Sequence, residues 1–190
     1  KNYLQTELTS RLDEYFFFFI ADIDGNYSST LQDEAGNISD RKYFPKIMED
    51  KTVISNPVIS KSTSEAIIVI GTPVKNNGEI KAILAATVKL SELSSYINDY
   101  NNNDDVYSFL VNGNGKIIAH PDQEKLYNHL FIESDNEFIL PNKLITNIIN
   151  NESGNFACNL NNNNKYAFHH ELGINNWKMV TILPQSLLQE

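Results

Sequence analysis

The sequence repeats one plan, first as YFFFFIADIDGNYSS at Tyr15–Ser29 and again as VYSFLVNGNGKIIAHP at Val106–Pro121. Each stretch runs from strand-forming apolar residues into Asp-Gly or Asn-Gly and then into a second strand-like segment. These pairs favour tight hairpin turns, because both positions of the turn need a positive φ. A polar stretch, a short helical segment and further strands follow each hairpin. The duplication therefore predicts an α+β fold of two small modules with antiparallel sheets, an arrangement typical of sensors rather than enzymes.

Composition limits the function classes. The 190 residues are 41% hydrophobic, with 10 Phe, 9 Tyr and 1 Trp, which suffices for one large core or two modest ones. The net charge of −9 argues against nucleic acid and against anionic membrane surfaces, which both require clustered Lys and Arg. The single cysteine, Cys158, excludes an intrachain disulfide. No stretch reaches the roughly 18 apolar residues of a membrane helix, and the first residue is Lys, so we expect an excised piece of a longer chain.

The order of periodic segments predicts module boundaries. Leu4, Leu8 and Leu12 recur at helical spacing, and the last residues after Pro184 begin another helical pattern. We expect the end of a stalk helix over 1–14, a first module over 15–90, a connecting helix and linker over 91–105, a second module over 106–184, and the start of a helix leading to a membrane over 185–190.

Within the first module, the unbroken apolar run Tyr15–Ile23 predicts a strand buried on both faces. Asp40 or Ser39 is expected to cap a helix that carries Tyr43, Phe44, Ile47 and Met48 on its inner face. Pro57 predicts an edge or bulge within a strand over 52–60, and Asn77-Gly78 predicts a hairpin turn between long strands.

Within the second module, the hairpin turn is expected at Asn112–Gly115 and a helix over Asn142–Asn150. A further hairpin is expected across the asparagine tract Asn161–Asn164, and a last strand over Trp177–Leu183.

These segments together resemble the double Cache sensor domains of bacterial membrane receptors, which consist of a membrane-distal and a membrane-proximal PAS-like module on a long N-terminal helix. The resemblance covers nearly the whole chain and rests on five stretches in order: DRKYF (40–44), SNPVISKSTSEAIIVIGTPV (55–74), NNGEIKAILAATVKL (76–90), FLVNGNGKIIAHPD (109–122) and NNWKMVTILP (175–184).

The resemblance implies a non-catalytic domain outside the cell or in the periplasm, without a cofactor, that binds a small molecule for a membrane-anchored receptor. The output implied is a diguanylate cyclase or a methyl-accepting chemoreceptor, with a histidine kinase as a further possibility. Dimerisation through the N-terminal helix is implied as well. A ligand-free PAS-like module for regulation or dimerisation is the alternative, and a hydrolase on an unfamiliar fold is a third reading without supporting motifs.

The resemblance also implies a ligand site in the first module. In amino-acid-binding members, the arginine of the helix motif binds the ligand carboxylate and the aromatic residues two and three places later enclose it. Here these are Arg41, Tyr43 and Phe44. Carboxylate binding by Arg41 is also favoured on chemical grounds alone, because a guanidinium offers a fork of donors that matches a carboxylate. The alternatives are an ion pair of Arg41 with Asp40, Asp33 or Glu34, and plain core packing of both rings.

Two positions depart from the amino-acid-binding pattern. Gly36 stands where a tyrosine is usual, and Thr87 aligns with the carboxylate that binds the ligand ammonium. A buried ammonium without a counter-charge is costly, so we expect a small carboxylate or another polar metabolite rather than an α-amino acid. Hydroxyl groups that could assist Arg41 belong to Ser60, Thr63, Thr72 and Thr87. For Thr72 and Thr87, the alternative is a hydroxyl that is hydrogen-bonded to the backbone.

No metal or catalytic site is expected. His169 and His170 are adjacent on a strand and so face opposite sides, and a Cys158–His pair lacks an orienting group. His120 is interpreted as a turn residue bonded to the backbone. Asp22 and Asp24 lack the rest of a calcium loop.

Overall fold

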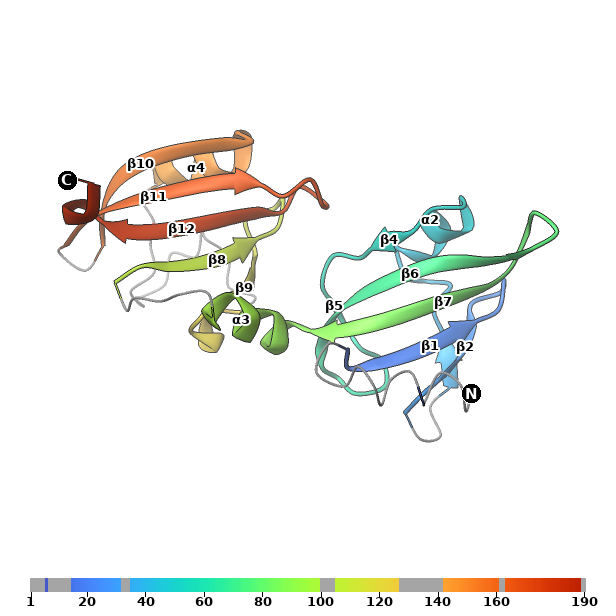
Figure 1. Cartoon of the computed structure of the whole chain (residues 1–190). Helices are drawn as coiled ribbons and strands as arrows, with labels where there is room; N and C mark the ends of the chain where they lie inside the picture. Colours follow the sequence, from blue (N-terminus) through green and yellow to red (C-terminus); the bar gives the residue numbers. More distant parts are fainter. Residues whose placement is uncertain are drawn as a thin grey trace. The chain divides into compact units, whose positions relative to one another are not determined.

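The computed structural model describes residues 6, 15–31, 35–99, 105–126, 142–160 and 163–188 (Figure 1). The chain divides into two compact units, a first unit of residues 1–90 and a second unit of residues 91–190. Each unit has its own antiparallel sheet, so the expected α+β fold of two PAS-like modules is confirmed. The stalk helix expected over 1–14 lies outside the described residues, apart from Thr6. Among the described residues, no helix has the length and apolar character to cross a membrane.

The first unit contains a seven-stranded sheet in the order β3-β2-β1-β7-β6-β4, with β5 also paired to β6. Its elements are β1 (Phe17–Ala21), β2 (Asn26–Ser29), β3 (Ala35–Asn37), α2 (Phe44–Met48), β4 (Val53–Ile54), β5 (Val58–Ile59), β6 (Ala66–Asn76) and β7 (Glu79–Lys89). The long β6–β7 hairpin turns at Asn77 and Gly78, with φ values of 52° and 83°, as a turn with two positive φ angles requires. This hairpin was expected from the sequence and is confirmed.

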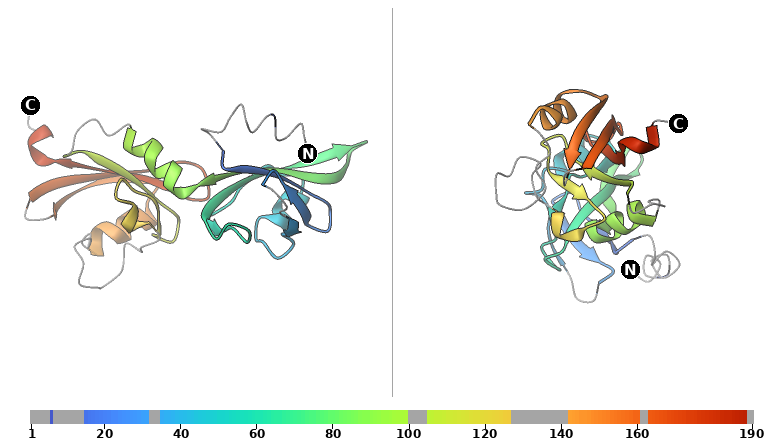
Figure 2. Two further views of the ribbon diagram at one scale, coloured as in Figure 1. Left: turned by 90° about the horizontal axis from the view of Figure 1, so that it is seen from below. Right: turned by 90° about the vertical axis from the view of Figure 1, so that its left-hand side faces the viewer.

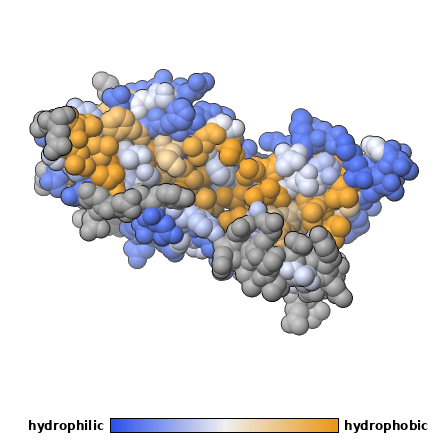
Figure 3. Space-filling view, in the orientation of Figure 1, coloured by the Kyte–Doolittle hydropathy of each residue, from blue (hydrophilic) through white to orange (hydrophobic). Residues whose placement is uncertain are grey.

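Strand β1 corrects one expectation. Phe17, Phe19 and Ala21 are buried, but Ile20 between them is 42% exposed. Burial therefore alternates, as in an antiparallel sheet with one face on the core, and the expectation of two buried faces is wrong. The exposed Ile20 on the outer face conceals the alternation in the sequence. Figure 3 shows that hydrophobic residues reach the surface of this unit.

Helix α2 packs closely against β6. Ile47 is fully buried, and a Cβ atom at Gly71 would lie 2.5 Å from its Cδ1, so the glycine makes room for the helix on the sheet. Tyr43 occupies the N-cap position without a side-chain capping bond. The expected cap by Asp40 or Ser39 is therefore wrong; the Asp40 carboxylate pairs instead with Lys61.

The second unit contains a five-stranded sheet in the order β10-β11-β12-β8-β9. Its elements are α3 (Leu90–Asp99), β8 (Tyr107–Val111), β9 (Ile117–Ala119), η1 (Gln123–Lys125), α4 (Asn142–Asn150), β10 (Ser153–Leu160), β11 (Asn163–Glu171), β12 (Lys178–Pro184) and η2 (Gln185–Leu188). The expected helix over 142–150 is confirmed, and it lies against one face of the sheet (Figure 2). Ile145 and Ile148 from this helix are fully buried beside Phe109, Val180 and Ile182.

Candidate ligand-binding site

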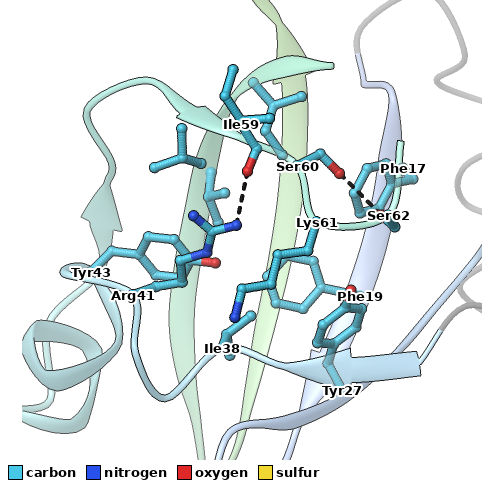
Figure 4. Close-up of a pocket in the computed structure, with 13 residues that line it drawn as sticks. Phe17, Phe19, Tyr27, Ile38, Arg41, Tyr43, Ile59, Ser60, Lys61 and Ser62 are labelled. Carbon is cyan, nitrogen blue, oxygen red and sulfur yellow. Dashed lines mark hydrogen bonds between the residues drawn. The ribbon is translucent and has the colours of Figure 1, made fainter. Parts of the chain in front are cut away.

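A cavity lies between the core face of the first sheet and two loops of the same unit (Figure 4). One loop runs from β3 to α2, and the other connects β5 to β6. The cavity has a volume of about 30 Å³, which leaves room for about two water molecules. Its lining consists of Phe17, Phe19, Tyr27, Ile38, Arg41, Tyr43, Val58, Ile59, Ser60, Lys61, Ser62, Ile67 and Val69.

Arg41 lines this cavity from the β3–α2 loop. The loop is fixed by backbone hydrogen bonds from Arg41 N to Ile38 O (2.9 Å) and from Phe44 N to Arg41 O (3.0 Å). The guanidinium Nη2 donates a hydrogen bond of 2.8 Å to the carbonyl oxygen of Ile59. Among the described residues, Arg41 has no carboxylate at salt-bridge distance, and Asp33 and Glu34 lie outside them. The hydrogen-bond partner of Arg41 at the edge of the cavity is thus a neutral carbonyl.

Lys61 is a second cation in the lining, and the sequence analysis missed it. Its Nζ donates hydrogen bonds to Asn37 O (2.9 Å) and to Asp40 Oδ1 (2.7 Å). The hydrogen bond from Lys61 holds the pKa of the Asp40 carboxyl below its usual value. In Figure 4 the Lys61 side chain extends toward the loop that carries Ile38. The sequence offered one indication of this role, because Lys61 lies between Ser60 and Thr63, two residues that were predicted to assist Arg41.

Two tyrosines form part of the wall. Tyr43 is buried, and this burial raises the pKa of its hydroxyl to about 12, so it stays a neutral hydrogen-bonding group. Tyr27 lies opposite Gly36 in the β2–β3 pair, and a Cβ at Gly36 would come within 2.8 Å of the Tyr27 ring. The ring of Tyr27 thus occupies the space above the glycine that replaces the usual tyrosine.

Of the four hydroxyl residues predicted to assist Arg41, one lines the cavity and three do not. Ser60 lines the cavity, and its hydroxyl lies 3.0 Å from that of Ser62, which is also in the lining. Thr63, Thr72 and Thr87 do not line the cavity. The Thr87 hydroxyl donates to Phe17 O (2.9 Å) and accepts from Phe17 N (3.1 Å).

The other two threonines have partners elsewhere. The Thr72 hydroxyl lies 2.8 Å from that of Thr52, and the Thr63 hydroxyl accepts a bond from the backbone of Glu65. Phe44 packs against the core cluster instead of lining the cavity, whereas Tyr43 does both. The structure therefore brings together Arg41, Tyr43 and Ser60 from the sequence-based set.

The chemistry of this arrangement suits an anion. Among the described residues of the lining, the charged ones are Arg41 and Lys61, the polar ones carry hydroxyls, and the others are apolar. Among the residues that the structure describes, no three His, Cys, Asp or Glu side chains are grouped so that they could hold a metal. Asp22, one of the candidate calcium ligands, accepts hydrogen bonds from Asp24 N (3.0 Å) and Asn26 N (2.9 Å) and so stabilises the β1–β2 turn.

Comparisons with known proteins agree with this fold. The chain is 32% identical over 79 residues to the methyl-accepting chemotaxis protein PscA of Pseudomonas syringae, covering 42% of this chain and 13% of that protein. It is 23% identical over 120 residues to the methyl-accepting chemotaxis protein PctB of Pseudomonas aeruginosa, covering 61% of this chain and 19% of that protein. This chain therefore spans less than a fifth of the length of either relative.

Solved structures extend the likeness over the full chain. The ligand-binding domain of PctB in complex with L-Arg matches 99% of this chain and 86% of that chain, with 17% identity and a TM-score of 0.69. The ligand-binding domain of the Pseudomonas fluorescens chemoreceptor CtaA in complex with L-isoleucine matches 95% of this chain and 72% of that chain, with 19% identity and a TM-score of 0.68. The family model described as Cache domain matches residues 2–190. The chain therefore belongs to the Cache domain family.

Proposed function

We propose that this chain is the sensor domain of a bacterial transmembrane receptor and that its first unit binds a small carboxylate or a similar polar metabolite. Membership of the Cache domain family over residues 2–190 supports the sensor role. The observation that carries the ligand class is Arg41, which lines the cavity and donates a hydrogen bond to the Ile59 carbonyl. A carboxylate is a stronger partner for a guanidinium than a carbonyl, because both groups are then charged and the contact can be bidentate.

Binding requires movement of the β5–β6 connection. A cavity of about 30 Å³ is too small for a metabolite. The segment 59–62 supplies one wall and is held by the Arg41–Ile59 hydrogen bond. A carboxylate that takes the place of the Ile59 carbonyl releases this segment, and the ligand then favours the open arrangement because it binds that arrangement more tightly. This difference in affinity is the source of the signal.

The receptor context follows the relatives. Both chemotaxis proteins named above favour a methyl-accepting chemoreceptor output over a diguanylate cyclase or a histidine kinase. The proposal includes a membrane-anchored parent protein, a position of this domain outside the cell or in the periplasm, and a homodimer formed through the N-terminal helix. Apolar segments of about 20 residues on both sides of this domain in the full-length gene would support the anchoring.

The small cavity favours a second candidate, a ligand-free PAS-like module for regulation or dimerisation. In that case the Arg41–Ile59 hydrogen bond is a permanent loop contact. The two candidates differ in whether any metabolite stabilises the folded protein.

A thermal-shift screen of small organic acids on the purified domain distinguishes these candidates. A ligand at 100 times its Kd stabilises the folded state by about 2.7 kcal/mol, and Arg41→Ala should abolish this shift. Lys42→Ala is the matched control, because Lys42 is exposed, adjacent in sequence and absent from the lining. A shift that persists in Arg41→Ala places the ligand elsewhere, and no shift with any acid favours the ligand-free module.

A further inference from the structure

We propose that the ligand is a short aliphatic dicarboxylate and that Lys61 is a specificity-determining residue that binds its second carboxylate. This inference rests on the proposed function, in which Arg41 binds the first carboxylate. It begins with charge: among the residues that the structure describes, two cationic side chains, Arg41 and Lys61, line the cavity, and no acidic side chain does. An anion with one charge that binds Arg41 would leave Lys61 paired with Asp40 and without a ligand contact.

The two cations come from different loops of the first unit. Arg41 belongs to the β3–α2 loop and reaches across to Ile59 O, whereas Lys61 belongs to the β5–β6 connection and reaches back to Asn37 O and Asp40 Oδ1. The apolar side chains of Ile38 and Val58 belong to the same lining. A ligand with charged ends and a few methylene groups between them matches charged groups above an apolar wall.

Asp40 now occupies the position that we assign to the second carboxylate. Its side chain is 64% exposed and that of Lys61 is 41% exposed. An ion pair so open to water contributes little to stability, because solvent screens it and holding two side chains in place costs entropy. A ligand carboxylate can therefore replace Asp40 as the partner of Lys61 at small cost.

The Arg41–Ile59 and Lys61–Asp40 contacts both hold the β5–β6 connection, so the release of one affects the other. Arg41 holds Ile59, and Lys61 itself lies two residues further along the same connection. A dicarboxylate that binds both cations thus opens both links of the β5–β6 connection, while a monocarboxylate opens the Arg41 link alone. We expect the dicarboxylate to bind more tightly than an isosteric monoanion.

Calorimetry with succinate and its half-amide, succinamate, tests this. The pair has nearly the same shape and differs by one charge. Succinate should bind the wild-type domain about tenfold more tightly than succinamate, as loss of one charged hydrogen bond implies. In Lys61→Met, which keeps most of the apolar stem, the ratio should fall to about twofold or less. Lys42→Met, the matched control, should keep the wild-type ratio.

Asp40→Asn provides an independent second variant. It removes the competing carboxylate, so succinate affinity should rise by about threefold. A stable fold in each variant is checked by its unfolding midpoint.

The outcomes separate the two proposals. Equal affinity for succinate and succinamate, with binding lost in Arg41→Ala, overturns the dicarboxylate inference and leaves the carboxylate sensor intact. A tenfold ratio that persists in Lys61→Met also overturns the role of Lys61. Binding of neither acid overturns the inference, and acid binding that survives Arg41→Ala contradicts the proposed site itself.

Discussion

The helix that packs on the sheet is short in the first unit and long in the second. Helix α2 has 5 residues and buries Ile47, whereas α4 has 9 residues and buries Ile145 and Ile148. In the first unit, loops that carry Arg41 and Lys61 cover part of the core face. Where a helix covers the sheet, apolar side chains fill the core; where loops cover it, a cavity with charged groups remains. The same architecture thus provides a packed core in one unit and a candidate binding site in the other.

The two units also differ in where their polar and charged side chains lie. All 4 histidines of the chain belong to the second unit, at positions 120, 129, 169 and 170. His120 and His169 are buried, and Lys178, also buried, donates a bond of 2.8 Å to Ile149 O at the end of α4. The Lys178 hydrogen bond stabilises the second unit internally by joining β12 to the end of α4. In the first unit, the charged groups border a cavity instead.

The largest expected effect concerns the packed core of the second unit. Ile148→Ala should lower its free energy of unfolding by about 2–5 kcal/mol, because a fully buried isoleucine leaves a cavity when truncated. Urea denaturation measures this loss. Met179→Ala, at a side chain that is 37% exposed in the same unit, should change stability far less. Similar values for both variants would contradict the tight packing of Ile148 in the core of the second unit.

Acid should destabilise the second unit through His120. Burial lowers the pKa of this imidazole to about 4 from a usual 6.5, with Lys125 lowering it further and Asp122 opposing. The unfolded state then binds more protons between these values, so stability is full above about pH 6.5 and falls as the pH drops toward 4. The loss from pH 7 to pH 5 should be on the order of 1–2 kcal/mol.

Unfolding midpoints at the two pH values measure this loss. His120→Gln should reduce it, while His170→Gln, at an exposed residue, should not. Burial also lowers the pKa of His169, so part of the acid sensitivity should remain in His120→Gln. An equal pH dependence in wild type and His120→Gln would remove His120 as its cause.

An added ammonium group should weaken binding in the first unit. L-Aspartate is succinate with one ammonium, and we expect it to bind about tenfold more weakly. The ammonium would face Arg41 and Lys61, and no acidic side chain among the described lining residues offsets it. Calorimetry measures the ratio. Micromolar binding of an L-amino acid would contradict the prediction.

A reverse test needs a carboxylate at the cavity. Thr87→Asp is unsuitable, because Thr87 is fully buried and its hydroxyl donates to Phe17 O, which a carboxylate cannot do. Ser62→Asp is preferable, since Ser62 lines the cavity. This variant should favour L-aspartate over succinate relative to wild type.

Residues close together in the chain sufficed to predict the turns and helices of the fold. The site residues were harder to predict, because they depend on contacts between residues that are distant in the sequence. The turn at Asn77-Gly78 and the helix over 142–150 follow from residues close in the chain. The sequence did not predict Lys61 as a site residue, because its partners Asn37 and Asp40 lie 24 and 21 residues away and only the fold brings the two loops together. The hydroxyl of Thr87 likewise bonds to a strand 70 residues distant, which no local pattern indicates.

The smallest expected effect is at Thr72. Its hydroxyl bonds to Thr52 and does not line the cavity, so Thr72→Ala should leave ligand affinity unchanged. Ser60→Ala is the contrasting variant, because the Ser60 hydroxyl lies in the lining beside Ser62. It should weaken binding by about threefold if it donates one neutral hydrogen bond to the ligand. Calorimetry on both variants decides between the cavity and the wider set of hydroxyls, because a loss of affinity in Thr72→Ala would place the ligand on the other face of β6.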